Sequence, residues 1–233
     1  MARLPESVDR VLSPSRFLID RFVAGGWGRE QFTYWPNGVP AVADSVGSRP
    51  ESSRPSGSLR VGFMGSVTPQ KGLHVLARAH RQLKRGTVEL HIHGDVKFDP
   101  SYWSDVRRDL VDSEVHVHGA FAAGEAARVL APLDVLVVPS IWYENAPLVI
   151  SEARASGVPV LTSRLGGMME MVEDGNDGLL FTPGDPDDLA RSLEALATDR
   201  DRLLDLTRSC RLPRTLEDDA GALRELYQSL MDE

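Results

Sequence analysis

The sequence predicts an α/β fold in which a parallel sheet is covered by helices on both faces. From residue 59 onward, short apolar runs rich in leucine and β-branched residues alternate with segments of helical spacing. Glycine, proline or aspartate bounds each run, which is typical of buried strands. Helices that connect neighbouring parallel strands form right-handed crossovers. The alternation therefore predicts a doubly wound parallel sheet of the Rossmann-like type.

Each predicted element follows from this alternation. The strands are expected at Leu59–Met64, Val88–His93, Val115–His118, Asp134–Val138, Val158–Thr162 and Gly178–Phe181. The helices between and after them are expected at Gly72–Leu83, Tyr102–Val111, Gly124–Leu130, Pro147–Ala155, Gly167–Val172 and Asp187–Leu196. A further helix over Leu216–Leu230 is expected to close the domain. The expected units are thus a Rossmann-like domain at 59–212 and a closing helix at 213–233.

Residues 1–40 predict a smaller unit that lacks a core of its own. Ser13 and Pro14 are typical of the N-cap and first turn of a helix, and Phe32–Trp35 indicates a strand. One helix and one or two strands cannot bury the aromatic side chains of this segment. We expect it to pack on the larger domain or to pair with a second copy of the chain or an acceptor-domain partner, with a disordered, adhesive segment as the alternative. Residues 41–58, rich in Ser, Pro, Gly and Arg, are expected to be a linker, with an ordered surface loop as the alternative.

Charge and cysteine content exclude several classes of protein. Lys and Arg number 26 against 34 Asp and Glu, which gives a net charge of -8, and no basic stripe is present. We therefore expect no nucleic-acid partner, and nonspecific adhesion to anionic lipid is not the expected main activity, although a local basic pocket is allowed. Cys210 is the single cysteine, which excludes an intrachain disulfide and is typical of a reducing compartment. The N-terminus has no pattern of a signal peptide, and no apolar run approaches the ~20 residues of a membrane helix. We therefore expect a cytoplasmic protein.

Ligands of open parallel sheets bind outside the carboxyl ends of the strands, and the first such loop runs from Gly65 to Gly72. A turn that starts with glycine lets backbone N–H groups approach an anion, and Lys71 adds a positive charge. The loop matches neither the dinucleotide fingerprint nor the phosphate-loop motif. It indicates a phosphate site, with a tight turn and a solvated lysine as the alternative.

The second such loop follows the strand at Asp134–Val138. Asn145 is expected to cap a helix that has Pro147 in its first turn, and the N-terminus of that helix would favour a phosphate. Glu152 lies near the apolar face of the same helix, where ligand hydroxyl groups would satisfy its carboxylate. The alternative is a solvated Glu144 and a Glu152 that is hydrogen-bonded to peptide groups.

Two histidine pairs lie on predicted strands, His91 with His93 and His116 with His118. Each pair lies on one side of its strand, and the two strands are candidates for neighbours in the sheet. Imidazole suits zinc, but strands packed on both faces favour a simpler interpretation as polar residues near the cleft. We therefore expect no metal ligands.

The loop and helix that carry Glu144 and Glu152 resemble the Glu-x7-Glu motif of retaining GT-B glycosyltransferases. The group that they resemble is glycosyltransferase family 4 ("glycosyl transferases group 1"). The motif is Glu144, seven residues and Glu152. Further matches come in the order of the family: Pro36-Asn37-Gly38-Val39, Gly62-Phe63-Met64-Gly65, Lys71-Gly72, Ala155-Ser156-Gly157-Val158-Pro159-Val160, Gly166-Gly167-Met168-Met169-Glu170, Asp174-Gly175-Asn176-Asp177-Gly178-Leu179-Leu180 and Pro183-Gly184-Asp185. The resemblance covers the chain from Ser13 to Tyr227.

The resemblance implies a role for each candidate residue. Glu144 would contact the donor sugar as the catalytic residue, and Glu152 would bind the ribose of the nucleotide. Gly65 and Lys71 would take the diphosphate, whereas Ser66 stands where many members carry an arginine. The backbone of the segment that begins the helix would lie against sugar and diphosphate: Asn145, Ala146, Pro147 and Leu148. His118 and Gly119 would line the base.

The resemblance also implies a reaction and its partners. A sugar would pass with retention from a nucleoside-diphosphate sugar, UDP- or GDP-linked, to a carbohydrate, lipid or small-molecule acceptor, with no cofactor and no metal. Residues 1–40 resemble only the last helix and strands of the acceptor domain, so we expect little transfer by this chain alone. The alternative is a non-catalytic nucleotide-sugar-binding module, or a subunit completed by a separate acceptor-domain chain.

Overall fold

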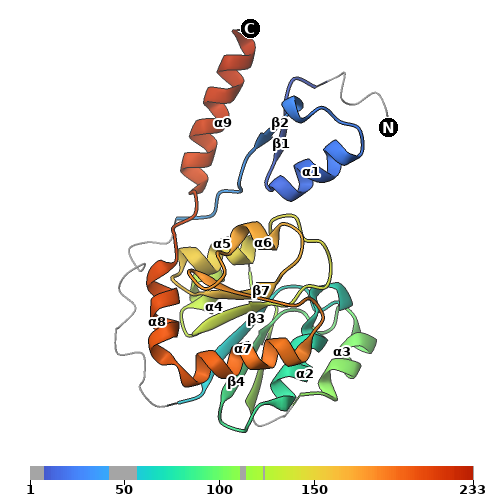
Figure 1. Cartoon of the computed structure of the whole chain (residues 1–233), viewed down its shortest axis with the longest axis vertical. Coiled ribbons are helices and arrows are strands. Elements are labelled where there is room, and N and C mark those ends of the chain that lie inside the picture. The colour runs from blue at the N-terminus through green and yellow to red at the C-terminus, as the bar shows by residue number, and fades with distance from the viewer. Residues whose placement is uncertain (1–7, 42–56, 111–113, 123, 233) are drawn as a thin grey trace.

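The computed structural model of the chain describes residues 8–41, 57–110, 114–122 and 124–232. They form a large α/β domain and a small N-terminal lobe, and the last helix lies beside the lobe (Figure 1). Most of the expected linker, residues 42–56, falls outside the described residues.

The large domain is built on a six-stranded parallel sheet with the order β5-β4-β3-β6-β7-β8. The predicted α/β class and parallel sheet are confirmed. The chain adds β4 and β5 on one side of β3 and then returns to place β6 on the other side, so the winding direction switches between β3 and β6. The strands are β3 (Leu59–Met64), β4 (Val88–His93), β5 (Val115–Gly119), β6 (Val135–Val138), β7 (Val160–Ser163) and β8 (Gly178–Phe181).

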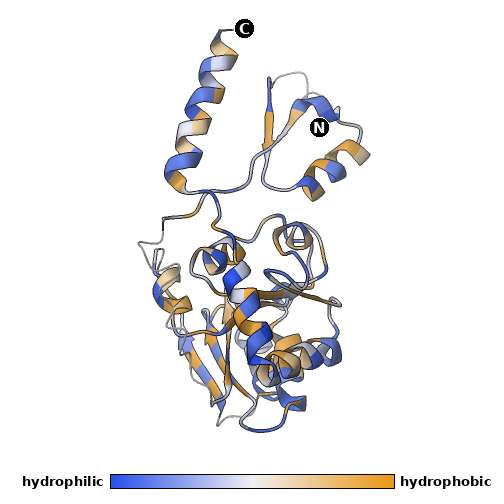
Figure 2. Ribbon diagram, turned by 60° about the vertical axis from the view of Figure 1, so that its left-hand side comes forward, coloured by the Kyte–Doolittle hydropathy of each residue, from blue (hydrophilic) through white to orange (hydrophobic). Residues whose placement is uncertain are grey.

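Helices cover both faces of this sheet, and each face has its own core. One core contains Val61 and Phe63 of β3, and the other contains Met64 of the same strand, as the two-residue period of a strand requires. The first core packs under α2 (Leu73–Gln82), α3 (Pro100–Arg107), α7 (Pro186–Thr198) and α8 (Arg200–Ser209). The second packs under α4 (Ala126–Leu130), α5 (Leu148–Ala155) and α6 (Met168–Met171). Hydrophobic and hydrophilic residues alternate along both the strands and the helices (Figure 2).

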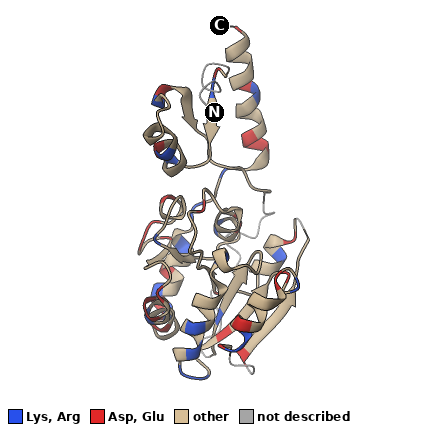
Figure 3. Cartoon of the chain, turned by 90° about the vertical axis from the view of Figure 1, so that its right-hand side faces the viewer, with Lys and Arg blue, Asp and Glu red and all other residues tan. Residues whose placement is uncertain are grey.

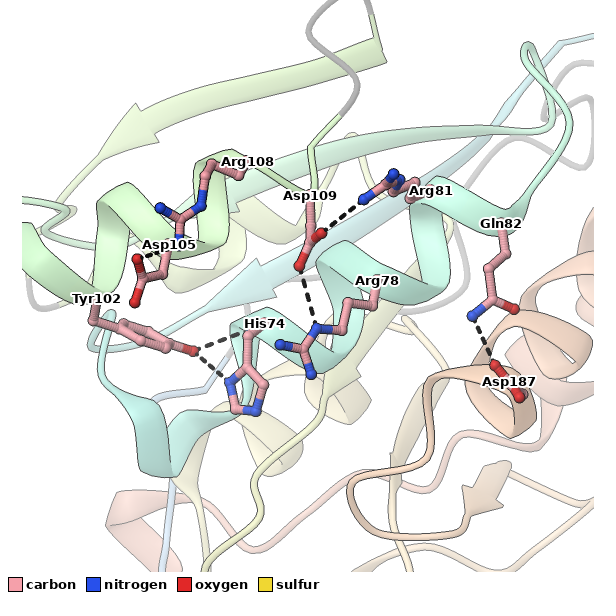
Figure 4. Close-up of polar contacts among 9 residues, drawn as sticks. All are labelled: His74, Arg78, Arg81, Gln82, Tyr102, Asp105, Arg108, Asp109 and Asp187. Carbon is pink, nitrogen blue, oxygen red and sulfur yellow. Dashed lines mark hydrogen bonds and ion pairs between the residues drawn. The ribbon is translucent and has the colours of Figure 1, made fainter.

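Polar side chains join the helices over the first core (Figure 4). The Asp109 carboxylate accepts from Arg78 Nε at 3.2 Å and from Arg81 at 3.1 Å, which ties the end of the α3 segment to α2. Gln82 of α2 donates to Asp187 of α7 at 2.7 Å. These exposed contacts order the helix layer, while the apolar faces beneath supply most of the burial.

The small lobe pairs β1 (Val11–Ser13) with β2 (Phe32–Tyr34) in parallel and packs α1 (Arg16–Ala24) against them. Phe22, Trp27 and Phe32 form an aromatic cluster, with ring centroids 5.3–5.8 Å apart. The predicted N-cap at Ser13 is wrong: the helix is capped by the side chain of Ser15, which accepts from Leu18 N. Ser13 is held in the strand pair, where its carbonyl accepts from Trp35 N at 2.7 Å, so the helix begins two residues later.

The last helix, α9 (Leu216–Met231), is attached to the small lobe rather than to the core of the large domain, and none of its residues is buried. Leu216 N donates to the Val39 carbonyl at 2.9 Å, and Val39 N donates to Arg214 O at 3.0 Å. The indole of Trp35 donates to Asp219 at 2.6 Å. The helix that was predicted to close the domain therefore extends the lobe (Figure 1).

Acidic and basic residues are interspersed over the face shown in Figure 3, with no broad field of one sign. Among the described residues, no helix is both long and apolar enough to cross a membrane.

Candidate functional site

The candidate site lies at the carboxyl ends of β3 and β6, where the winding of the sheet switches direction and open α/β sheets bind their ligands. The loops that follow these two strands are bonded together, because Ile141 N donates to Gln70 O at 3.0 Å. Gly72 has a φ of 71°, and a side chain there would clash with the Pro139 carbonyl. Glycine at this position therefore lets the two loops meet.

Lys71 and Glu144 are brought together from these two loops. Lys71 Nζ lies 2.7 Å from Glu144 Oε1, and the Ser140 hydroxyl donates to the same oxygen at 2.9 Å. The side chains of Lys71 and Glu144 are 35% and 17% exposed, so the two groups are ion-paired with each other rather than freely solvated. The ion pair holds the ammonium group at the mouth of the two loops.

A third loop, which follows β7, packs against the backbone of Glu144 and Asn145. Gly167 N donates to the Glu144 carbonyl at 2.8 Å, and a side chain at Gly167 would clash with the Asn145 carbonyl. Gly166 has a φ of 58° and would meet the Glu144 carbonyl in the same way. The paired glycines thus allow a backbone-to-backbone approach that sets the position of Glu144.

Asn145 does not cap α5, contrary to the sequence-based prediction. The N-cap is Pro147, which has an extended conformation, and Leu148 begins the helix two residues later than an Asn145 cap would allow. The Asn145 side-chain oxygen instead accepts from the hydroxyl of Ser15 in the small lobe. No side chain of the described residues caps α5, so its N-terminus, from Ala146 to Leu148, is left to a ligand or to solvent.

Glu152, in the second turn of α5, differs from Glu144 in the surroundings of its carboxylate. The side chain is half-buried, and this desolvation raises the pKa of its carboxyl group above the ordinary value. Within the described parts of the chain, no side chain or peptide group bonds to this carboxylate. The alternative of a Glu152 held by peptide groups is therefore not observed, and its acceptor capacity is free for a ligand.

A cavity of about 290 Å³ opens beside the first loop, at the carboxyl ends of β3, β4 and β5. Of the predicted residues, it is lined by Gly65 and Ser66. The other lining residues were not predicted, because they follow strands without any motif: Gly94, Asp95, Phe98, Ala120 and Phe121. Gly65 has a φ of 145° and its carbonyl lies where a side chain on Gly94 would be, so the two turns press together. The aromatic and small residues give this cavity an apolar wall.

The predicted base-binding pair, His118 and Gly119, is divided between two places. Gly119 ends β5 directly before the lining residues Ala120 and Phe121. The His118 ring turns to the sheet face, where it stacks on His93 with centroids 4.3 Å apart, and lines a second cavity of about 460 Å³. Burial, with His118 nearby, lowers the pKa of His93 to about 4.

In the part of the chain that the structure describes, no helix covers the histidine side chains of β5 at the edge of the sheet. We expected strands packed on both faces, and this is wrong for β5, whose residues His116, Val117 and His118 are exposed at the edge of the sheet. The predicted adjacency of the two histidine strands is confirmed, because His91 lies opposite His116 in the ladder between β4 and β5.

The small lobe contacts the site through the first turn of α1. The Glu170 carboxylate, near the start of α6, accepts from Arg16 N at 2.7 Å and also from Phe17 N. The Phe17 ring stacks on Tyr143 with centroids 5.6 Å apart. A carboxylate at a helix N-terminus is favourable, so the lobe is held against the loop that carries Glu144.

The profile of the family described as "Glycosyl transferases group 1" matches residues 58–199, which include both loops of the site. The chain belongs to the glycosyl transferases group 1 family. The large domain is accordingly the C-terminal, Rossmann-like half of a GT-B fold.

Curated relatives in the glycosyl transferases group 1 family are much longer than this chain. The D-inositol 3-phosphate glycosyltransferase of Stackebrandtia nassauensis is 31% identical over 210 residues, which cover 84% of this chain and 46% of that protein. The GDP-mannose-dependent alpha-mannosyltransferase of Corynebacterium glutamicum is 32% identical over 177 residues, 74% of this chain and 40% of that protein. The chain therefore spans less than half the length of these two relatives.

Solved structures show the same fold. HepE of Anabaena, in complex with UDP and glucose, superposes with a TM-score of 0.79 at 20% identity, covering 97% of this chain and 64% of that one. Sucrose-phosphate synthase of Thermosynechococcus elongatus superposes with a TM-score of 0.77 at 26% identity, covering 97% and 59%.

Proposed function

We propose that this chain is the nucleotide-sugar-binding half of a retaining glycosyltransferase. The reaction transfers a sugar from a nucleoside-diphosphate sugar to an acceptor. The observation that carries the proposal is the free, half-buried carboxylate of Glu152 beside the switch between β3 and β6. Ribose hydroxyl groups are donors of the kind that this carboxylate lacks, and their binding compensates its desolvation.

The diphosphate would lie between Lys71 and the N-terminus of α5. Lys71 is held by Glu144 in the free protein, and a diphosphate competes with that carboxylate for the ammonium group. Negative charge develops on the leaving diphosphate during transfer. Lys71, once released from Glu144, and the uncapped terminus of α5 would stabilise that charge, so the proposed site requires no divalent ion.

Glu144 would contact the donor sugar after the lysine turns to the diphosphate. Its backbone is fixed by the Gly167 hydrogen bond, and its carboxylate retains the Ser140 hydroxyl as a donor. The arginine that many family members carry at position 66 is replaced here by Ser66, which removes a bidentate phosphate donor. Lys71 therefore supplies a larger share of the phosphate binding in this chain.

The nucleobase would occupy the cavity lined by Phe98 and Phe121, next to Gly119. Apolar and aromatic walls suit a base, whose faces stack on such side chains. The HepE structures contain UDP, and one relative is named for GDP-mannose, so uridine and guanosine nucleotides are the first ligands to compare.

Calorimetric titration with UDP and GDP tests the binding half of the proposal. The parent chain should bind one of them saturably. Glu152→Gln should weaken that binding about ten- to hundredfold, because a charge-assisted hydrogen bond contributes about 1.5–3 kcal/mol. Glu194→Gln, at an exposed position of α7, is the matched control and should bind as the parent does. Equal affinities of parent and Glu152→Gln would exclude the ribose assignment.

A second assay tests transfer. Purified chain is mixed with UDP- and GDP-sugars, and released nucleoside diphosphate is measured with carbohydrate, lipid or small-molecule acceptors and with water alone. We expect binding with almost no turnover, because acceptor binding in the family is assigned to a domain that the matched region does not include. Robust acceptor-dependent turnover would show that this chain is sufficient. Binding with no turnover even after addition of an acceptor-domain chain would favour the non-catalytic module.

A further inference from the structure

A second cluster of polar side chains lies away from the donor site, on the open face of β4 and β5. Glu89 and His91 are two residues apart on β4 and point to the same side, and His116 lies opposite His91 on β5. Glu89 Oε1 is 2.9 Å from His116 Nε2 and 3.6 Å from His91 Nε2. One ligand atom from each of the three residues lies within 4.8 Å of the others.

The two distances from Glu89 Oε1 are close to those between ligands of a tetrahedral zinc ion, and the two histidine ligand atoms lie within 4.8 Å of each other. Zinc bonds nitrogen and carboxylate oxygen at about 2.0–2.2 Å, so two ligand atoms of a tetrahedral ion lie roughly 3.3 Å apart. The two observed distances, 2.9 and 3.6 Å, lie on either side of that value. The ring nitrogen of His91 that faces the cluster is buried and has no hydrogen bond. A bound ion would satisfy this nitrogen.

The surroundings fix the orientation of the ligands. The other ring nitrogen of His91, Nδ1, lies 3.0 Å from His118 Nε2, so a metal-bound His91 would donate its Nδ1–H to this ring nitrogen, in place of the carboxylate, carbonyl or water that usually accepts it. Arg60 approaches the second carboxylate oxygen of Glu89, Oε2, at 3.9 Å and leaves Oε1 to the cluster. The His116 side chain is 45% exposed, so a hydrated ion reaches the cluster from solvent.

We propose that Glu89, His91 and His116 bind a zinc ion with water at the fourth position. The ion would join the exposed edge strand β5 to its neighbour β4. Glu89 is the second residue of β4, whereas the donor site lies at the opposite, carboxyl end of the strands. The ion therefore stabilises the sheet edge and takes no part in sugar transfer. This assignment replaces the expectation of no metal ligands that the histidine spacing alone supported.

The test uses tag-free protein, stripped with a chelator and titrated calorimetrically with zinc chloride. We expect one ion per chain, with binding weakened at least about 100-fold in His116→Gln and in Glu89→Gln. His118→Ala, which removes the contact with His91 Nδ1 and the stacking on His93 but no ligand, should lose about ten- to hundredfold. His74→Gln is the matched control, because His74 bonds Tyr102 on the other side of the sheet. Cobalt in place of zinc should give the intense visible absorption of a four-coordinate ion.

Thermal unfolding supplies an independent measurement. Zinc at about 100 times its dissociation constant should raise the melting temperature of the parent by about 5–10 °C, and should leave that of His116→Gln unchanged. Circular dichroism of each metal-free variant establishes that it is folded. Absence of saturable binding to the parent, or equal zinc affinity in parent and His116→Gln, would overturn the proposal. Nucleotide titrations of the same variants keep this result separate from the donor site.

Discussion

Glu152 should show opposite changes in stability and in affinity when its charge is removed. In the free protein, the carboxylate is half-buried without a bonding partner among the described residues, and burial raises the pKa of its carboxyl group. The native state then holds this proton to a higher pH than the unfolded state does. The free energy of unfolding therefore falls as the pH rises through the interval between the ordinary and the raised pKa.

Glu152→Gln removes this titration and keeps the shape of the side chain. We expect the variant to melt at a higher temperature than the parent at pH 7, and the difference to shrink toward pH 4. Affinity for nucleoside diphosphate should change in the other direction, by the ten- to hundredfold loss of a charge-assisted hydrogen bond. A carboxylate that is costly to the free protein and useful to the complex is typical of a binding site.

The assay is a pair of measurements on parent, Glu152→Gln and Glu194→Gln. Melting temperatures are recorded across pH 4–8, and UDP or GDP is titrated at pH 7. Glu194→Gln, whose side chain is exposed, should follow the parent in both. A Glu152→Gln variant that melts lower than the parent at pH 7 would refute the electrostatic reasoning. One that binds nucleotide unchanged would refute the role in binding.

Three other predictions follow from the site and the core. Lys71→Ala should weaken binding of a nucleoside diphosphate about ten- to hundredfold and leave the affinity for the bare nucleoside unchanged, and the loss should be smaller at high salt. Equal losses on both ligands would mean that the lysine acts through the fold. Gly167→Ala should lower the free energy of unfolding by about 1–3 kcal/mol, because its methyl group would meet the Asn145 carbonyl. Gly221→Ala, which has open space in α9, should be neutral or stabilise by up to about 1 kcal/mol. Urea unfolding of both variants measures the difference. Burial lowers the pKa of His80 below 6.5, so the unfolded state binds the proton first as the pH falls. The melting temperature should therefore fall below about pH 6.5, and it should fall less steeply in His80→Gln. Melting curves at several pH values measure this.

The sheet was predictable because most of its strands place apolar side chains in the core. Leu59–Met64, Val88–His93 and Gly178–Phe181 have the predicted bounds, since apolar residues occupy at least every second position along each of these strands. Helix α8 was missed because charged residues dominate it and only Leu203 and Leu206 face the core. Local capping signals also misled: Ser13 and Asn145 are good capping residues by type, but strand pairing and the small lobe engage them instead.

The site could be predicted where glycine and charged residues mark a loop after a strand. It could not be predicted where residues without a motif line the cavity. Lys71 and Glu144 come together because they follow strands that neighbour in the sheet. Three residues line the cavity only because they follow β4 and β5: Asp95, Phe98 and Phe121. Their spacing in the sequence does not indicate a cavity. The zinc cluster depends on which residue of β5 stands opposite which residue of β4, and a single sequence does not fix that register.

The bridge between Val39 and Thr215 has a mechanical consequence. At this bridge the chain passes from the large domain to α9 and from the small lobe toward the large domain, with the two passages bonded side by side. The two passages are therefore coupled in position. The contacts of α1 with Glu170 and Tyr143 lie away from this bridge and hold the lobe at a second place. A lobe that tilted at the bridge would lose these contacts, and with them the hydrogen bond that the Ser15 hydroxyl donates to Asn145, next to Glu144.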